Sequence, residues 1–217
     1  MDGLERTSNA HGPIRVLVAD DHPVVRAGLT AVLVQQPDLE LVAEAENGQR
    51  AVALFREHRP DVCLMDLRMP VMDGVEAIRT ITGEFPAARI LALSTYEGDA
   101  DIRRALEAGA RGYLLKDMLL TDVIGAVRAV RRGDRVIPTA VAARLAEFPE
   151  RSELTEREVE VLQLVARGLS NKEVARAIGR TDETVKIHLK NTFVKLGVAD
   201  RTEAVTVALT RGLIHLD

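Results

Sequence analysis

The stretch DVCLMDLRMPVMDG, residues 61–74, decides how the first part of the chain folds. Its apolar run Val62–Met65 is short and continuous, which is typical of a strand buried on both faces of a parallel sheet. Asp66 follows directly, where such a strand would leave the sheet. The segment then passes through Pro70 to Gly74, residue types that favour a turn. We therefore expect a buried strand that ends in an aspartate.

Four further runs of this kind precede and follow that stretch. They are Ile14–Ala19, Leu39–Ala43, Ile90–Leu93 and Gly112–Leu115. Amphipathic helical patterns alternate with the runs, at Val24–Gln35, Gln49–His58, Val75–Glu84, Asp99–Ala108 and Leu120–Arg132. Five strand-helix units in succession predict an α/β domain, a five-stranded parallel sheet that is doubly wound, with helices on both faces.

Polar side chains stand at the ends of four of these strands. The first strand is followed by Asp20 and Asp21, the third by Asp66, the fourth by Ser94 and the fifth by Lys116. The carboxyl ends of parallel strands share one edge of the sheet, so these groups should converge. Two carboxylates ~4 Å apart repel by about 4 kcal/mol at an effective dielectric near 20, and a cation must offset this. Oxygen ligands suit Mg²⁺, and a carboxylate beside an ammonium and a hydroxyl can take up a phosphoryl group.

Each of these residues also has a simpler interpretation when taken alone. Asp20 and Asp21 could cap the first helix, Asp66 could open a turn, Ser94 could be a turn residue, and Lys116 could be a solvated lysine. The coincidence of all five at strand ends favours one shared site.

The segments VLVADDHPVVRAGL, LMDLRMPVMDG, LALSTYE and GARGYLLKD together resemble a receiver domain of the NarL/FixJ type. The resemblance covers nearly all of residues 14–132 and implies a flavodoxin-like fold. It implies that Asp66 is the phosphorylated residue, with Mg²⁺ held by the side chains of Asp20, Asp21 and Asp66 and by the carbonyl of Arg68.

The same resemblance assigns roles to three further residues. Ser94 and Lys116 would contact the phosphoryl group, and Tyr113 matches the aromatic switch position. A tyrosine buried in the core is the alternative interpretation of Tyr113.

The last part of the chain contains helix signals and no strand-like run. Capping boxes, in which a hydroxyl precedes a glutamate by three residues, occur at Thr155–Glu158 and Ser170–Glu173. Thr181 and Asp200 offer two further caps. These signals predict an all-α domain of four helices, with the second and third joined by a turn around Gly179 as in a helix-turn-helix.

The third of these helices, Glu183 to Leu196, separates into two faces at roughly 100° per residue. One face is apolar and should be core: Val185, Leu189, Phe193 and Leu196. The other carries Lys186, Ile187, Lys190, Asn191 and Val194. Aliphatic side chains among lysines suit a helix in the major groove of DNA, where they meet thymine methyl groups. A solvated helix with incidental aliphatic residues is the alternative.

The segment LTEREVEVLQLVARGLSNKEVARAIGRTDETVKIHLKNTFVKLGVADRTEAV, residues 154–205, resembles a LuxR-type helix-turn-helix domain. The resemblance implies that Lys186, Ile187 and Lys190 contact the groove and that Thr184 and Asn191 hold the phosphate backbone. In the last helix, Val205, Ala208 and Leu209 are predicted to help form a symmetric dimer contact. Packing of all three inside one domain is the alternative.

Composition and charge limit the class of protein. The net charge is -4 from 29 Lys+Arg and 33 Asp+Glu, and it divides into -5 for residues 1–150 (18 basic, 23 acidic) and +1 for residues 151–217 (11 basic, 10 acidic). The single cysteine, Cys63, excludes an internal disulfide. No signal peptide or membrane-length apolar run is evident, which predicts a cytoplasmic protein without membrane contact. The predicted organisation is a flexible N-terminus at 1–13, a receiver at 14–132, a linker at 133–152 and a DNA-binding domain at 153–217.

Three functions compete for this organisation. The favoured one is a two-component response regulator, in which a sensor histidine kinase phosphorylates Asp66 and thereby controls binding to promoter DNA, the protein being a homodimer when phosphorylated or DNA-bound. Such a protein is no enzyme beyond taking part in its own phosphorylation and dephosphorylation. A phosphatase with an aspartyl nucleophile would leave the last domain unexplained. A degenerate receiver that only dimerises is disfavoured by the presence of all five pocket residues.

Overall fold

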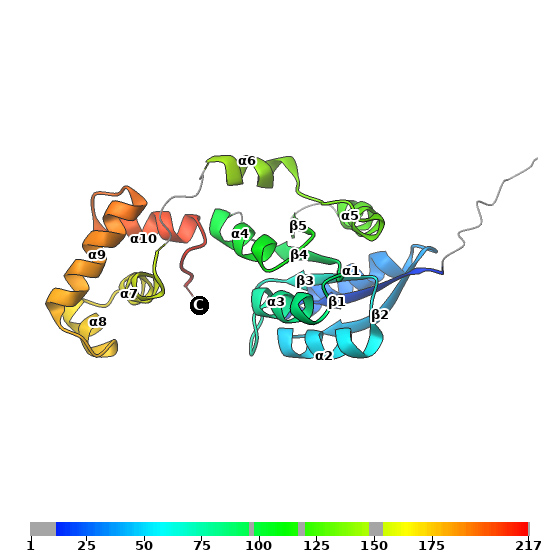
Figure 1. The fold of residues 1–217 in the computed structure, drawn as a ribbon, viewed down its shortest axis with the longest axis horizontal. Coiled ribbons are helices and arrows are strands. Elements are labelled where there is room, and N and C mark those ends of the chain that lie inside the picture. Colours follow the sequence, from blue (N-terminus) through cyan, green and yellow to red (C-terminus); the bar gives the residue numbers. More distant parts are fainter. Residues whose placement is uncertain (1–11, 96–97, 117–119, 148–153, 217) are drawn as a thin grey trace, which may run out of the picture. The chain divides into compact units, whose positions relative to one another are not determined.

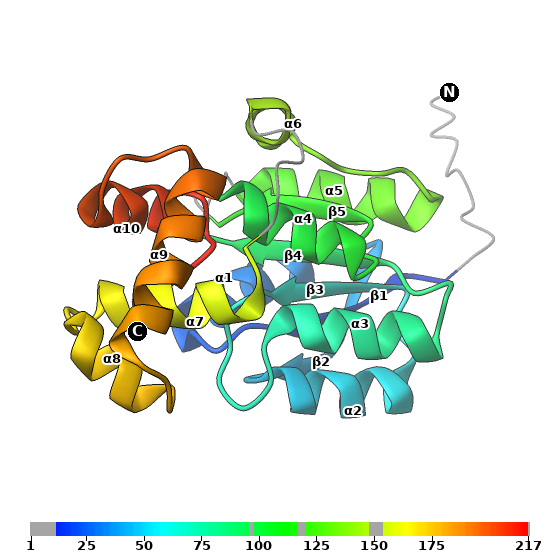
Figure 2. The ribbon, with the colours of Figure 1, turned by 60° about the vertical axis from the view of Figure 1, so that its left-hand side comes forward.

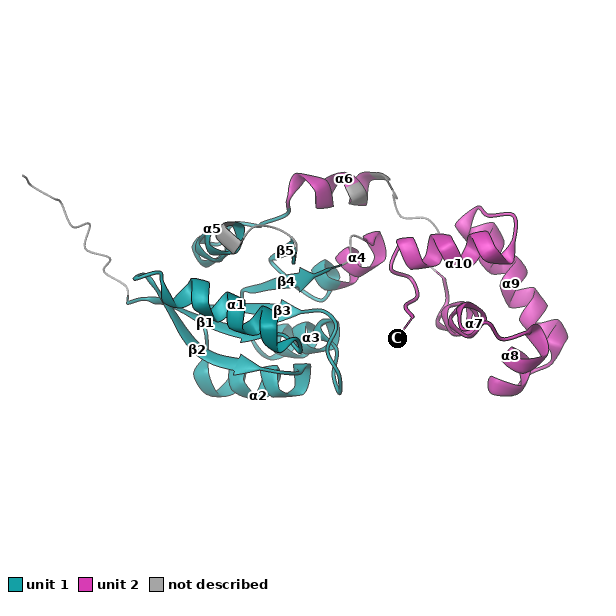
Figure 3. Cartoon of the chain, turned by 180° about the vertical axis from the view of Figure 1, so that it is seen from behind, with its two compact units in different colours: residues 1–95, 105–137 teal, residues 96–104, 138–217 magenta. Residues whose placement is uncertain are grey.

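The computed structural model describes residues 12–95, 98–116, 120–147 and 154–216. Nearly all of the predicted flexible N-terminus lies outside these residues, as does the last part of the predicted linker. The chain divides into two compact units, one of residues 1–95 and 105–137 and one of residues 96–104 and 138–217 (Figure 3). This division into units does not test the domain limits predicted from the sequence, which stay a prediction.

The first unit is built on one parallel sheet of five strands in the order β2-β1-β3-β4-β5 (Figure 1). The strands are β1 Ile14–Ala19, β2 Leu39–Ala45, β3 Val62–Asp66, β4 Ile90–Ser94 and β5 Gly112–Leu115. In register, Val16 to Ala19 of β1 pair with Val62 to Met65 of β3. The predicted doubly wound α/β fold is confirmed.

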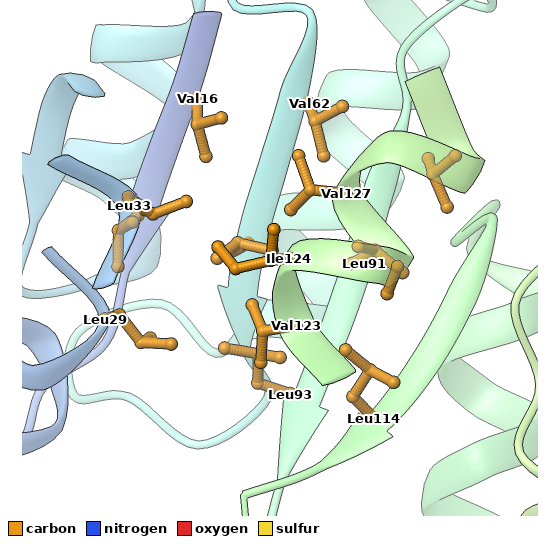
Figure 4. Close-up of a cluster of buried hydrophobic side chains, with 14 of the residues drawn as sticks. Val16, Leu29, Leu33, Val62, Leu91, Leu93, Leu114, Val123, Ile124 and Val127 are labelled. Atoms are coloured by element: carbon orange, nitrogen blue, oxygen red, sulfur yellow. The ribbon is translucent and has the colours of Figure 1, made fainter. Parts of the chain in front are cut away.

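Helices cover both faces of this sheet. They are α1 Pro23–Val34, α2 Gly48–His58, α3 Gly74–Glu84 and α5 Leu120–Arg132, whereas α4 Asp99–Glu107 is divided between the two units. The alternation of side chains along a strand sends Val16 and Val18 of β1 to one face, where they form a core with residues of α1 and α5 (Figure 4). Leu17 points to the opposite face, which α2 and α3 cover (Figure 2). Burial on both faces explains why the strands lack polar alternation.

The second unit consists of helices. Beside the first part of α4 they are α6 Thr139–Glu147, α7 Glu156–Ala166, α8 Asn171–Ala177, α9 Asp182–Leu196 and α10 Arg201–Thr210. The four caps predicted for α7 to α10 are all present, because Thr155, Ser170, Thr181 and Asp200 each accept a hydrogen bond from a backbone amide of the first turn. A common core joins α7 to α10, and it includes Val161, Leu162, Val174, Val185 and Ala204.

Within this unit, an ion pair joins the start of α4 to the residue that follows α10. Arg211 donates through Nε and Nη2 to the two carboxylate oxygens of Asp99, at 3.0 and 2.9 Å. The amide of Ala100 also donates to the carbonyl of Arg211 at 3.1 Å. Asp99 is buried, so this two-point contact satisfies a carboxylate that would otherwise be costly to bury.

Candidate phosphorylation site and DNA-binding helix

The strand order brings together the residues predicted to form a phosphorylation site. β1 and β3 are neighbours in the sheet, so Asp20, just after β1, lies beside Asp66, the last residue of β3. β4 and β5 follow in order, which places Ser94 and Lys116 at the same edge. This is the edge at which ligands bind in open parallel sheets.

Lys116 lies between two buried carboxylates. Its Nζ is 2.7 Å from Asp66 Oδ2 and 2.8 Å from Asp20 Oδ2. The Asp20 side chain is fully buried and that of Asp66 is 2% exposed. One ammonium thus holds together two like charges that would otherwise repel each other.

Burial and charge act in opposite directions on the carboxyl group of Asp66. Burial raises its pKa, the Lys116 ammonium lowers it, and the Asp20 charge raises it again, which leaves the pKa at about 6. For Lys116, burial alone would lower the pKa, but the two carboxylates raise it above its usual value. Near neutral pH the site therefore holds an ionised Asp66 beside a fully protonated lysine, as a nucleophile for phosphorus requires.

The backbone after β3 is tightly packed around Asp66. The amide of Arg68 donates to Asp66 Oδ1 at 3.3 Å, and the amide of Gly74 donates to the Leu67 carbonyl at 2.9 Å. A Cβ atom at Gly74 would lie 2.0 Å from the Asp66 carbonyl oxygen, closer than any side chain allows. Asp73 then caps α3 by accepting from the Glu76 amide at 2.8 Å. The sequence MDG thus lets α3 begin directly against the strand that carries Asp66.

An acidic cluster at this edge fits a divalent cation. Asp20, Asp21, His22 and Asp66 each offer a ligand atom within 4.8 Å of the others. Among the described residues, Asp20 Oδ2, Asp21 Oδ1 and Asp66 Oδ2 accept no hydrogen bond of good geometry, although each lies beside a positively charged or protonatable nitrogen. Carboxylate oxygens in this state are hard ligands, which Mg²⁺ and Ca²⁺ prefer.

His22 is a member of this cluster that the sequence did not point to. Its Nδ1 is 2.7 Å from Asp21 Oδ1, and its amide donates to Asp20 Oδ1 at 2.9 Å. His22 is also the N-cap residue of α1, without a side-chain cap. The alternative interpretation was that Asp20 and Asp21 cap the first helix. The only contact of this kind that the structure shows is the one from the His22 amide to Asp20, and His22 lies just before α1 begins.

The other residues assigned by the resemblance are placed as follows. Ser94 is buried at the end of β4, and its carbonyl accepts from the Lys116 amide at 2.7 Å. Tyr113 is completely buried on β5, opposite Ala92 of β4, as a core tyrosine would also be. Their roles toward a phosphoryl group stay predictions.

In the second unit, α9 presents two distinct faces. Val185, Leu189 and Thr192 are buried against the rest of the unit. The outward side chains are exposed: Glu183, Lys186, Ile187, Lys190, Asn191 and Val194. Thr184, at the start of the helix, is partly buried, and its hydroxyl lies 2.9 Å from that of Thr181.

The predicted dimer contact in α10 needs one correction. Ala208 has no exposed surface and lies in the core formed with α7 to α9, so this residue cannot contact a second chain in this structure. Its small side chain is buried where α10 packs on the other helices. Val205 and Leu209 are also packed on that core but keep part of their surface. Their contact with a second chain stays a prediction.

Two families match the two parts of the chain. The response regulator receiver domain matches residues 16–128, and the LuxR family of bacterial regulatory proteins matches residues 152–208. The chain belongs to the response regulators of two-component systems that carry a LuxR-type DNA-binding domain. The resemblances seen in the sequence are thereby confirmed.

Relatives of this regulator match along nearly their whole length. The transcriptional regulatory protein LnrK of Bacillus subtilis is 39% identical over 216 residues, which span 92% of this chain and 98% of LnrK. The crystal structure of ChrA, a response regulator in a heme-sensing two-component system, is 40% identical with a TM-score of 0.57, over 94% of this chain and 100% of ChrA. A structure of two RcsB dimers bound to two parallel DNAs is 28% identical with a TM-score of 0.65, over 92% and 99% of the chains.

The regulator shows no helix, within its described residues, with the length and apolar character needed to cross a bilayer.

Proposed function

We propose that a sensor histidine kinase phosphorylates this regulator on Asp66 and that phosphorylation controls its binding to promoter DNA through α9. The observation that carries the proposal is the placement of Asp66: a buried carboxylate at a strand end, 2.7 Å from Lys116 Nζ and beside the acidic pair Asp20 and Asp21. Promoter binding also places the protein in the bacterial cytoplasm.

The chemistry follows from the groups around Asp66. An Asp66 carboxylate oxygen attacks the phosphorus of a phosphohistidine, the O–P bond forms, and the P–N bond to the imidazole breaks. Lys116 and the Ser94 hydroxyl contact the transferred phosphoryl oxygens. Because Lys116 already pairs with Asp66, the new negative charge forms beside an ammonium that is held in place.

Mg²⁺ fits the donor set of this site. Asp20, Asp21, Asp66 and the carbonyl of Arg68 would hold it, and when bound it neutralises charge on the phosphoryl oxygens. Without a metal ion, Lys116 pairs with Asp20 and Asp66 while Asp21 adds a third carboxylate to the cluster, which leaves an excess of negative charge that repels an incoming phosphate.

The DNA-binding part of the proposal rests on the outward face of α9. Lys186, Ile187 and Lys190 would enter the major groove, and Thr184 and Asn191 would contact the phosphate backbone of the DNA. A helix-turn-helix reader of this size usually binds as a dimer on two half-sites, and RcsB was solved as dimers on DNA. We extend this to the present chain, with Val205 and Leu209 near the contact.

Phosphorylation of the intact protein tests the site directly. The full chain is incubated with Mg²⁺ and acetyl phosphate, and the intact mass is measured with and without base treatment. The wild type should gain one base-labile phosphoryl group, and Asp66→Asn should gain none. Asp134→Asn, which alters an exposed aspartate, is the matched control and should behave as wild type. Equal phosphorylation of Asp66→Asn and wild type would overturn the assignment.

A further inference from the structure

A stripe of four side chains runs along the outward face of α9. Glu183, Ile187, Lys190 and Val194 follow one another at spacings of four, three and four residues, so they line up at roughly 100° per residue. Their exposed fractions include 76% for Glu183, 54% for Ile187 and 76% for Val194. The stripe spans about 16 Å along the helix, several base pairs of a groove.

The acidic end of this stripe is unexpected on a helix that meets DNA. Glu183 lies in the first turn of α9, and the amino-terminal residues of a recognition helix are those that reach base edges. A carboxylate there is repelled by phosphates, so it weakens binding to DNA of arbitrary sequence. The cost is recovered only where the carboxylate finds a hydrogen-bond donor on a base.

Folding explains the position of Glu183 only in part, because the helix dipole favours an acid in the first turn of α9 and Asp182 already supplies one there. Thr181 supplies the side-chain cap of α9 through the amide of Thr184, so the helix does not need Glu183 as its cap. The contact of Glu183 that the structure shows is a long one, 3.5 Å from Oε2 to Lys186 Nζ. Lys186 is closer to Asp182, at 3.0 Å, so Glu183 is the weaker of its two partners. Glu183 is thus held only loosely and can turn toward a ligand.

Resting on the proposed function, we infer that Glu183 determines sequence specificity by accepting a hydrogen bond from the N4 amino group of a cytosine in the major groove. Cytosine presents a donor there, and carboxylates are its usual partners. Guanine and thymine present acceptors, which repel a carboxylate, and the N6 donor of adenine stands beside the N7 acceptor. One turn further along, Ile187 presents an aliphatic side chain suited to a neighbouring thymine methyl group.

Binding-site selection from a random duplex library tests this inference. The full chain, treated with Mg²⁺ and acetyl phosphate, is used as wild type, Glu183→Gln and Glu183→Ala. Glu156→Gln is the control, because it removes the same charge from an exposed residue in the first turn of α7. Ile187→Ala marks the position of the adjoining thymine in the selected motif.

Wild type and Glu156→Gln should enrich the same motif, with a cytosine next to the thymine whose selection depends on Ile187. Glu183→Ala should lower the preference for that cytosine about tenfold. Glu183→Gln should replace it with adenine, because glutamine pairs with both N6 and N7 of that base.

Two outcomes would overturn the inference, and they differ in meaning. If wild type selects a motif that Glu183→Gln leaves unchanged, or if Glu183→Gln merely binds all sequences more tightly, Glu183 reads no base while the proposed function stands. If wild type selects no motif at all, the proposed function fails together with the inference.

Discussion

Glu158 of α7 and Lys195 of α9 form an ion pair, 2.7 Å from Oε2 to Nζ, inside the DNA-binding unit. The same carboxylate accepts a hydrogen bond from the Thr155 amide at 2.8 Å, which completes the capping box of α7. Burial alone would raise the pKa of Glu158, but Lys195 and Thr155 lower it below its usual value. One buried glutamate therefore starts one helix and fixes the helix that we expect to enter DNA.

The first prediction concerns this pair. Glu158→Gln should destabilise the DNA-binding unit by about 1–3 kcal/mol, because the ion pair between the buried Glu158 and Lys195 is lost and the cap is weakened. Hydrogen exchange of α9 amides in the full chain measures the effect. Glu160→Gln, on the same helix but exposed, should change the free energy of opening measured by exchange by less than about 0.5 kcal/mol. Equal exchange in the two variants would show that the pair contributes nothing.

The lowered pKa of Glu158 also gives the sign of a pH effect. A carboxyl group with a depressed pKa in the folded state stabilises fully above its usual value and loses this contribution as the pH falls through the folded value. Between pH 5 and 3, α9 protection should decline more in wild type than in Glu158→Gln.

The second prediction concerns Gly74. In Gly74→Ala the new methyl group meets the Asp66 carbonyl, so α3 or the strand must shift, at a cost of about 1–3 kcal/mol. Phosphorylation by acetyl phosphate should also slow, since Asp66 moves. Gly83→Ala in the same helix meets nothing within 4 Å and should be neutral or stabilising. The stability to denaturant and the rate of phosphorylation are measured for both variants and for wild type. A Gly74→Ala protein as stable and reactive as Gly83→Ala contradicts the packing.

The third prediction is a pH profile for phosphorylation. Because burial raises the pKa of Asp66 to about 6, a growing fraction of this nucleophile is protonated as the pH falls through that value. At limiting Mg²⁺ the rate with acetyl phosphate should decline from pH 7 to pH 5, with its midpoint near the pKa. Saturating Mg²⁺ favours the ionised carboxylate and should move the midpoint lower. A rate that is flat down to pH 5 at limiting Mg²⁺ would refute the raised pKa.

The fourth prediction separates the two lysines of α9. Lys190→Ala should weaken DNA binding by about 1–3 kcal/mol if the lysine reads a base, or lower the salt slope by about one if it neutralises a phosphate. Lys186 pairs with Asp182 and must leave it to bind DNA, so Lys186→Ala should cost less than Lys190→Ala. Arg132→Ala, exposed at the end of α5, is the control. Titrations of DNA with each variant at several salt concentrations distinguish base reading from phosphate neutralisation. If both lysine variants bind DNA as tightly as wild type, the outward face of α9 does not contact DNA.

Local patterns in the sequence predicted most of the fold. The apolar runs located all five strands, and three strands extend beyond the predicted runs: β2 to Ala45, β3 to Asp66 and β4 to Ser94. The capping box at Thr155 and Glu158 was evident from two residues three apart. Such features depend on neighbours in the chain, which the sequence shows.

Contacts between distant residues were not predictable in this way. Nothing near Lys195 in the sequence indicates that it pairs with Glu158, 37 residues earlier. Ala208 was predicted to contact a second chain because helical spacing shows which face of α10 carries it. That spacing does not show how much of the face is buried in the core of the same unit. The convergence of Asp20, Asp66 and Lys116 was predictable because parallel topology fixes which strand ends meet.

The central claim is that phosphorylation of Asp66 controls DNA binding. The most direct test is the affinity of the full chain for a selected duplex with two half-sites, measured by fluorescence anisotropy before and after treatment with Mg²⁺ and acetyl phosphate, alongside sedimentation. Treated wild type should bind more tightly, as two protomers per duplex, while Asp66→Asn should show the same affinity with and without treatment. Unchanged affinity of treated wild type, or an equal gain in Asp66→Asn, would contradict the account.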